Sequence, residues 1–423
     1  MAKVLLISLE IVGKSMAGPG IRYYEFAKAL SLHHEVVLAC PNQADIESAG
    51  FKFETHKNLE RLIHRADVVV VQELSLKLAF WIRKYKKNLI IDAYDPQYLE
   101  HLEIFKAYPL YMRENRNRVA IDNASLSLSY ADGVLCANKT QKDLWLGHLM
   151  AIKKVDPRLY DQDPSLNSFL SIVPFGLSHE PLKPLTGIRK KFGIKEDDLL
   201  LLWGGGIWNW FDPLTLLKAL AKTNDKSIKL VFMGLKHPND KVPEMKMARD
   251  TVNLAKELDL LDSQVFFNYG WTPYEERQAF LYEADAGVSF HLKHLETRYA
   301  FRTRLLDYLW AGLPMIVTEG DCFADLIKEK GAGMVVGYED VEGLKNALIA
   351  MKTDSRSKMR EASYAIAKTF EWPKVIEPLD QMISKLAFNK ASPKKTLPLL
   401  KAFLRLRNPV TVYKSIMTGR YGR

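Results

Sequence analysis

Cysteine is scarce in this sequence. Three cysteines, Cys40, Cys136 and Cys322, are scattered far apart through 423 residues. A disulfide framework needs an even set of cysteines in a short chain, and a structural zinc site needs cysteine or histidine pairs a few residues apart. Neither pattern is present, so we expect no disulfide framework and no zinc site. No other stretch has metal-ligand spacing, and we expect no metal site and no cofactor. A reducing, cytoplasmic location fits this cysteine usage.

Long apolar runs are also missing. No stretch reaches the roughly 18 apolar residues of a membrane-spanning helix. The first apolar run, residues 4–12, is interrupted by Glu10 and is preceded by a single lysine, so no secretory signal peptide is expected. The overall composition, 48% hydrophobic and 26% charged, is that of an ordinary globular protein.

Acidic residues are absent from the last part of the chain. Residues 389–423 contain nine lysines and arginines and no Asp or Glu, so the rest of the chain carries only +1 of the net charge of +10. Because the body is nearly neutral, nucleic acid is not an expected partner. Within 396–407, leucines and Phe403 are interleaved with basic residues, a pattern typical of a helix lying on an anionic membrane surface. The alternative is a tail that packs on the N-terminal domain or stays solvated.

Short runs rich in branched apolar residues alternate with helical patterns along the chain. This alternation predicts parallel β-sheets covered by helices on both faces. The chain is long enough for two such domains, and a stretch rich in proline and glycine separates two sets of strands. We therefore predict an α/β protein with two Rossmann-like, doubly wound domains. Their predicted limits are residues 1–180 and 188–370, joined by a linker at 181–187.

Two glycine-rich loops follow predicted strands. The loop at residues 13–20 contains Gly18 and Gly20 and precedes Arg22, but it lacks the third glycine of a dinucleotide fingerprint, which argues against a nicotinamide enzyme. The second loop, Gly204, Gly205 and Gly206, follows a strand at 199–203. Without side chains, its N–H groups are free to approach an anion. The loop at residues 13–20 can equally be a simple turn between a strand and a helix.

Residues 291–321 contain the richest cluster of signals. A polar loop leads into a helical pattern that ends at Gly312, with Pro314 preventing its continuation, and a short strand follows at 315–318. Arg304 and Asp307 are three residues apart and so share one helix face. Polar groups at a helix start beside the carboxyl end of a strand suit a phosphorylated ligand. The alternative is an exposed ion pair between the two residues, which contributes little.

This stretch resembles the C-terminal domain of the family 4 retaining glycosyltransferases, which have the GT-B fold. In that family a first and a second glutamate precede a helix end made of small residues and followed by a proline, and Ala311, Gly312 and Pro314 resemble that helix end. Asp307 takes the place of the second glutamate, and Arg304 takes that of a basic residue one helical turn before it. The first glutamate position falls on Tyr299, and Glu296 is the candidate substitute.

The resemblance implies a retaining, metal-independent transfer of a sugar from a nucleotide-sugar to a glycan or lipid-linked acceptor, in synthesis of cell-envelope polysaccharide or glycoconjugate. It also implies that residues 371–388 cross back to the first domain. The rival hypothesis is a degenerate nucleotide-sugar-binding protein that acts as a scaffold or partner subunit. The donor phosphates are normally held by an arginine and a lysine in the second glycine loop, where this chain has Ile207 and Asp212; Arg302 and Arg304 are expected to compensate.

The predicted roles are as follows. The residues expected to take part in catalysis are Glu296, Asp95 and Arg22. The residues expected to bind the donor are Gly18, Gly20, Gly204, Gly205, Gly206, Trp208, Arg302, Arg304 and Asp307. Asp95 lies at the end of a predicted strand, before Pro96, and can also be a plain turn residue. Trp208 either walls the donor pocket or packs the domain.

Overall fold

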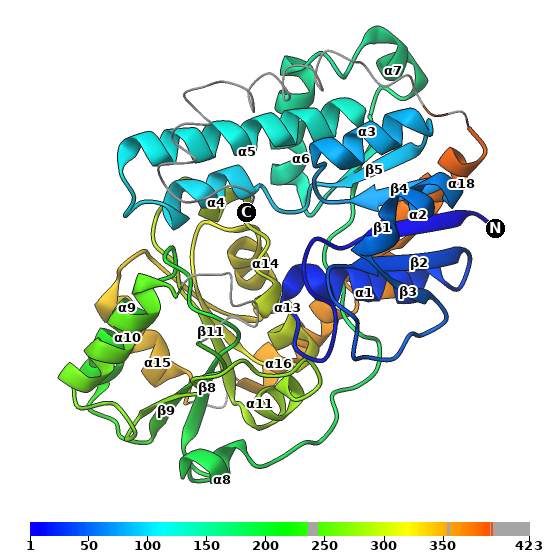
Figure 1. Cartoon of the computed structure of the whole chain (residues 1–423). Helices are drawn as coiled ribbons and strands as arrows, with labels where there is room; N and C mark the ends of the chain where they lie inside the picture. The colour runs from blue at the N-terminus through cyan, green and yellow to red at the C-terminus, as the bar shows by residue number, and fades with distance from the viewer. Residues whose placement is uncertain (236–243, 353–355, 390, 392–423) are drawn as a thin grey trace.

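The computed structural model describes residues 1–235, 244–352, 356–389 and 391, and it contains two parallel sheets (Figure 1). The first sheet has seven strands in the order β3-β2-β1-β4-β5-β6-β7, and the second has six in the order β10-β9-β8-β11-β12-β13. The strands of the first sheet are β1 (Lys3–Ile7), β2 (Glu35–Cys40), β3 (Lys52–Thr55), β4 (Val68–Val71), β5 (Asn88–Asp92), β6 (Gly133–Cys136) and β7 (Leu170–Ile172). Those of the second are β8 (Leu199–Trp203), β9 (Ile228–Phe232), β10 (Val265–Phe267), β11 (Ala286–Ser289), β12 (Met315–Thr318) and β13 (Gly333–Val336).

Helices connect the strands. Up to the second sheet they are α1 (Gly18–Leu30), the 3₁₀-helix η1 (His56–Asn58), α2 (Leu59–Arg65), α3 (Leu76–Lys84), α4 (Gln97–Ile104), α5 (Leu110–Tyr130), α6 (Lys139–Ala151), α7 (Pro157–Gln162) and α8 (Ile188–Phe192). After it come α9 (Pro213–Thr223), α10 (Lys246–Glu257), α11 (Arg277–Glu283), α12 (Leu295–Tyr299), α13 (Thr303–Trp310), α14 (Cys322–Lys330), α15 (Val341–Ala350), α16 (Arg356–Ala367), α17 (Trp372–Val375) and α18 (Glu377–Ala387). The predicted α/β architecture of two doubly wound domains is confirmed.

The apolar runs of the sequence form strands in the parts of the sheets that are buried on both faces. In β4 all four residues are valines, and all are buried, as expected for the interior of a parallel sheet. The edge strand β3 was not predicted, because it is only partly buried and three of its four residues are polar. The pattern at 171–177 gave a strand only as far as Ile172. Pro174, which has no N–H, follows in the extended segment that leads to the second sheet.

The predicted helix end around Gly312 is confirmed. Helix α13 stops at Trp310, Gly312 has a φ of +64°, and β12 begins at Met315. A Cβ on Gly312 would lie 2.3 Å from the ring of Tyr364, so the position requires glycine for packing as well as for its φ. The prediction of Asp212 as an N-cap with Pro213 in the first turn is also confirmed: the Asp212 side chain accepts a hydrogen bond from the Thr215 N–H at 3.0 Å.

The C-terminal helices return to the first sheet. Figure 1 shows α18, in orange, beside the blue strands of that sheet, and α18 contacts β4 and β7. The N–H of Leu177 donates to the carbonyl of Phe370 at 2.7 Å. The Trp372 ring lies against the rings of Phe26 and Phe175, at centroid distances of 5.8 and 5.4 Å. One apolar cluster therefore contains residues of α1, α13 and α17, and it joins the two halves of the molecule.

Within the described ranges, no helix is both long and apolar enough to cross a membrane. The predicted basic tail, 389–423, lies outside the described residues except for positions 389 and 391.

Candidate functional site

A buried ion pair marks the place where the two halves meet. Glu296, on the short helix α12, accepts two hydrogen bonds from the Arg302 guanidinium, at 2.8 and 2.7 Å. Both side chains are almost fully buried. The pair is thus bidentate and shielded from water, the geometry in which an arginine–carboxylate contact is strongest.

Three further carboxylates surround this pair. Asp321, the N-cap of α14, has its Oδ2 3.9 Å from the Nε of Arg302. Asp95, just beyond β5, and Glu100, on α4, belong to the N-terminal half and interact electrostatically with Glu296. Four carboxylates therefore share one guanidinium, and we call Asp95, Glu100, Glu296, Arg302 and Asp321 the carboxylate cluster.

The excess of negative charge favours bound protons in this cluster. Burial, followed by the charge of Glu296, raises the pKa of Asp95 to about 7. Burial and the neighbouring Asp95 raise the pKa of Glu100 well above its usual range. Because like charges in a desolvated site cannot all ionise, the cluster holds at least one exchangeable proton near neutral pH. Asp95 accepts no side-chain hydrogen bond from any described residue, so its carboxyl group is available to a ligand.

The second glycine loop lies against α13. The Nη2 of Arg304 donates to the carbonyl of Gly206 at 2.7 Å, and the guanidinium lies over the Phe211 ring, 4.2 Å from its centroid. Its Nη1 is buried and has no partner among the described atoms. Burial lowers the pKa of Arg304 to about 10, so the group stays charged at neutral pH. A desolvated cation with a free donor attracts an anion strongly.

Tyr308 holds this loop in place. Its hydroxyl accepts from the Gly204 N–H at 2.6 Å and donates to the Leu202 carbonyl at 2.8 Å. The ring fits because Gly287 has no side chain; a Cβ there would lie 2.3 Å from it. Gly205, with a φ of +84°, and Gly206 have N–H groups that donate to no described acceptor. Two N–H groups and the Arg304 guanidinium thus gather at the carboxyl end of β8.

A chain of contacts leads from Asp307 to helix α1. The Nε of Arg277 lies 3.4 Å from Asp307 Oδ1, and Arg277 also donates to the carbonyl of Tyr274. The Tyr274 N–H donates to the carbonyl of Lys14 at 2.9 Å, and its hydroxyl donates to Glu25 at 3.1 Å. The start of α1 is thereby fixed to the second domain, and its first turn, Gly18–Gly20, has no side-chain cap. Uncapped N–H groups at a helix start favour anions.

Comparison with known proteins identifies the second domain. Residues 186–369 match the model of the family described as glycosyl transferases group 1. The second domain is therefore similar to the group 1 glycosyltransferases. No curated protein matches this sequence.

Solved structures, a glycosyltransferase among them, share the fold of most of the chain. HepE from Anabaena, in complex with UDP and glucose, has a TM-score of 0.65 and 12% identity, over 91% of this chain and 100% of that one. WaaG, a glycosyltransferase involved in lipopolysaccharide biosynthesis, has a TM-score of 0.60 and 18% identity, over 90% and 99%. Sucrose-phosphate synthase from Thermosynechococcus elongatus has a TM-score of 0.61 and 15% identity, over 91% and 99%. The chain therefore has the GT-B architecture of these transferases.

Several of the predicted site residues lie close together in the structure. Asp95 and Glu296 approach from opposite domains. Arg304 reaches the glycine loop. Asp307 lies on the same helix and is paired with Arg277, so the alternative of an exposed ion pair between Arg304 and Asp307 is wrong.

Other predicted roles need correction. Arg22 is fully buried; it makes a bidentate pair with Asp92 at 2.8 Å and donates to the carbonyls of Val173 and Pro174. It therefore braces the first domain and does not project toward a ligand. Arg302 is occupied by Glu296 and does not replace the missing loop cations. The N–H of Gly204 is occupied by Tyr308 and is not free for an anion.

The other residues predicted to bind the donor differ in how closely neighbouring atoms surround them. Gly20 packs against Ile11, since a Cβ there would lie 2.3 Å from the Ile11 carbonyl oxygen, whereas a Cβ on Gly18 would meet nothing within 4 Å. Trp208 stacks on Trp210, with centroids 5.4 Å apart and planes 10° from parallel. It packs on the second core, as in the packing alternative.

Sequence reasoning missed Arg277, Glu100 and Asp321. Arg277 and Glu100 lie in ordinary polar helix patterns, and only the packing of distant segments brings them to the site. Asp321 had a usable signal, because it directly follows a strand and begins a helix.

Proposed function

We propose that this protein is a retaining glycosyltransferase that moves a sugar from a nucleotide-sugar donor to a glycan or lipid-linked acceptor. The observation that carries the proposal is the Arg304 guanidinium, which is buried, charged and has an unpartnered Nη1 beside the open N–H groups of Gly205 and Gly206. The group 1 glycosyltransferase match of the same domain supports it. UDP is the probe of choice, because the HepE structure of the same fold holds UDP.

Negative charge grows on the diphosphate as it leaves the anomeric carbon. Preorganised donors in a site without water stabilise such charge without reorganisation. In this chain Arg304, the N–H groups of Gly205 and Gly206 and the uncapped start of α1 are the groups proposed for that task, and no metal is required. Asp307 is proposed to bind the ribose hydroxyls, exchanging its contact with Arg277 for them.

Positive charge develops on the sugar ring at the same time. The carboxylate cluster is proposed to face this ring, with Glu296 held in place by Arg302. Asp95, with its raised pKa, is the group best placed to exchange a proton with the acceptor. We assign no nucleophile.

Titration with UDP tests the donor site. Arg304→Ala and Asp307→Ala should each weaken UDP binding by about 1.5–3 kcal/mol, the usual range for hydrogen bonds to charged groups, or roughly 10- to 100-fold. The exposed Arg360→Ala variant removes the same type of charge elsewhere and should bind UDP like the wild type. Unchanged UDP affinity in both site variants would remove these residues from the donor site.

Turnover of a panel of uridine nucleotide-sugars tests the activity itself. Activity should survive EDTA, and the product should keep the anomeric configuration of the donor. Loss of activity with EDTA that Mg²⁺ or Mn²⁺ restores would contradict the metal-independent mechanism. UDP binding without hydrolysis or transfer of any donor would instead favour a degenerate binding protein, the alternative suggested by Tyr299 at the first glutamate position.

A further inference from the structure

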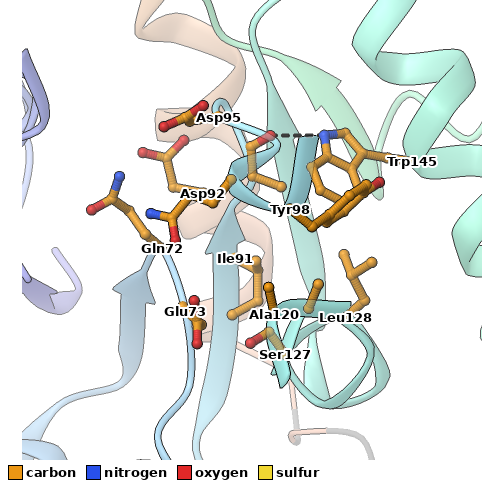
Figure 2. Close-up of a pocket in the computed structure, with 13 residues that line it drawn as sticks. Gln72, Glu73, Ile91, Asp92, Asp95, Tyr98, Ala120, Ser127, Leu128 and Trp145 are labelled. Atoms are coloured by element: carbon orange, nitrogen blue, oxygen red, sulfur yellow. Dashed lines mark hydrogen bonds between the residues drawn. The ribbon is translucent and has the colours of Figure 1, made fainter. Parts of the chain in front are cut away.

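A separate cavity lies in the N-terminal domain, next to the carboxylate cluster (Figure 2). It is bounded by the ends of β4 and β5, the start of α4, and one face each of α5 and α6. Its lining residues are Gln72, Glu73, Ile91, Asp92, Ala93, Asp95, Gln97, Tyr98, Ala120, Ala124, Ser127, Leu128 and Trp145. Through Asp95 it shares a wall with the cluster to which the donor sugar is assigned.

The charged residues that line the cavity are all acidic. It contains three carboxyl groups and no lysine, arginine or histidine. Asp92 is neutralised by Arg22. Glu73 accepts one hydrogen bond, from the Asn123 amide at 2.6 Å, and Asp95 accepts none from a described side chain. The cavity therefore presents Glu73, which has no cationic partner among the described residues, and Asp95, which shares the Arg302 guanidinium with three other carboxylates.

The remaining walls suit a small polar molecule with an apolar face. Tyr98 and Trp145 meet edge to face, with centroids 5.7 Å apart, and the Trp145 N–H donates to the Ala93 carbonyl at 2.7 Å, which fixes the ring (Figure 2). Ile91 and Leu128 form an apolar side, and Gln72 and Gln97 supply amides. The volume is about 50 Å³. At roughly 10–15 Å³ for each water it holds about four waters, which is enough for one substituted edge of a sugar ring.

These features define which ligands fit. Carboxylates with free lone pairs need hydrogen-bond donors, which hydroxyl and ammonium groups provide. A ligand carboxylate or phosphate offers only acceptors and would lie close to Glu73, whose like charge no described cation offsets, a costly arrangement in a desolvated site.

We propose that this cavity binds the acceptor and selects a hydroxyl- or amino-bearing sugar group over one that carries a carboxylate or phosphate. The proposal rests on the proposed function, since an acceptor exists only for a transferase. It adds the chemical class of the acceptor group and names Glu73 as the residue that determines the charge specificity.

Ligand-observed NMR with simple probes tests this selectivity. Methyl glucoside, glucosamine and glucuronate are compared on the wild type with UDP present in excess, so that the donor site is filled. The glucoside and glucosamine should bind and glucuronate should not. Glucuronate binding as tight as that of the glucoside would overturn the proposal.

Variants that change the charge of Glu73 test whether the sugars bind in this cavity. Glu73→Lys should weaken glucosamine binding at least tenfold and allow glucuronate to bind, whereas Glu73→Gln should keep the glucoside and remove the preference for the amine. Because Glu73→Gln hardly changes the side-chain volume, it tests the role of Glu73 even if Glu73→Lys does not fold. The control Glu114→Lys makes the same charge change at an exposed position on α5, a helix that lines the cavity, and should behave like the wild type.

The donor-site variant separates the two proposals. Arg304→Ala should lose UDP affinity and keep glucoside binding. If the Glu73 variants leave sugar binding unchanged while UDP still binds, the cavity proposal fails and the proposed function stands. If the wild type binds no UDP, the donor site itself fails.

Discussion

Arg302 and Arg304 lie two residues apart at the start of α13, yet their environments differ. Arg302 has a bidentate carboxylate partner, Glu296. Arg304 has only a carbonyl and aromatic faces, and one of its nitrogens has no partner among the described residues. Burial without a counter-ion makes Arg304 the stronger candidate for binding an anion. The missing carboxylate partner, more than the residue type, distinguishes Arg304 from Arg302.

The raised pKa of Asp95 predicts a pH dependence of stability. Its folded-state pKa of about 7 is well above the unfolded value of roughly 4, so the stability it contributes is complete below about pH 4 and is lost as the pH rises toward 7. Asp95→Asn cannot ionise, so between pH 5 and pH 8 its free energy of unfolding should gain about 2–3 kcal/mol relative to the wild type. Urea unfolding at the two pH values measures this.

Glu196→Gln serves as the control, because Glu196 is exposed. Its difference from the wild type should be the same at both pH values. An Asp95→Asn difference that does not change with pH would show that Asp95 ionises normally in the folded protein.

At the scale of elements, each glycine loop is shaped by one close contact. Gly20 allows α1 to pass the Ile11 carbonyl, and Gly287 makes room for the Tyr308 ring that positions the second loop. These glycines are needed because another segment approaches closely. Gly18, two residues before Gly20, has open space around it. Gly18 is therefore a suitable control for a substitution at Gly20.

Alanine substitutions in this pair should have different effects on stability. Gly20→Ala forces the 8–17 loop away from α1 and should lower the free energy of unfolding by about 1–3 kcal/mol, as overpacking does. Gly18→Ala meets no atom within 4 Å and should change it by less than about 0.5 kcal/mol, or raise it slightly by restricting the unfolded chain. Denaturant midpoints compare the two. Equal losses for both would mean that the close approach to Ile11 does not decide stability.

For the whole molecule, the joint between the domains is built from distant parts of the chain. Trp372 lies under Phe26 and Phe175, and a Cβ on Gly176 would lie 2.4 Å from its ring. Asp380 on α18 contacts His33 and His34, at 2.9 and 2.7 Å. The return of the last helices to the first sheet therefore stabilises both domains together.

Removing the central aromatic ring of this joint should destabilise the whole chain. Trp372→Ala is expected to lower the free energy of unfolding by about 3–5 kcal/mol, since it leaves a cavity between the domains. Phe388→Ala removes a ring that is 86% exposed and should cost less than about 0.5 kcal/mol. Calorimetry of both variants compares them. A wild-type melting curve for Trp372→Ala would show that the joint contributes nothing.

The basic tail, residues 389–423, is predicted to bind an anionic membrane surface. Most of it lies outside the described residues, so vesicle binding is the test. Each basic residue near an anionic surface contributes about 1 kcal/mol. The full chain should therefore sediment with anionic vesicles but not neutral ones, and less so as salt rises. A chain ending at Phe388 should stay in solution; equal sedimentation of both forms would rule the tail out.

The sequence alone was sufficient to predict local features, such as strands and helix ends. Hydrophobic patterning identified most strands, and the glycine, proline and capping signals located the end of α13 and the start of α9. These features depend on neighbours within a few residues, so the chain itself encodes them. The resemblance of residues 304–314 to a known family added the expected two-domain architecture.

Only the tertiary structure decided the partners of the charged residues. Arg22 bonds to Asp92 and to carbonyls about 150 residues away, Asp307 pairs with Arg277, and the Gly204 N–H bonds to Tyr308. The carboxylate cluster likewise draws Asp95 and Glu296 from different domains. Such pairings depend on how separate segments pack, and a buried charge takes whichever partner packing brings within reach. Local patterns do not contain that information.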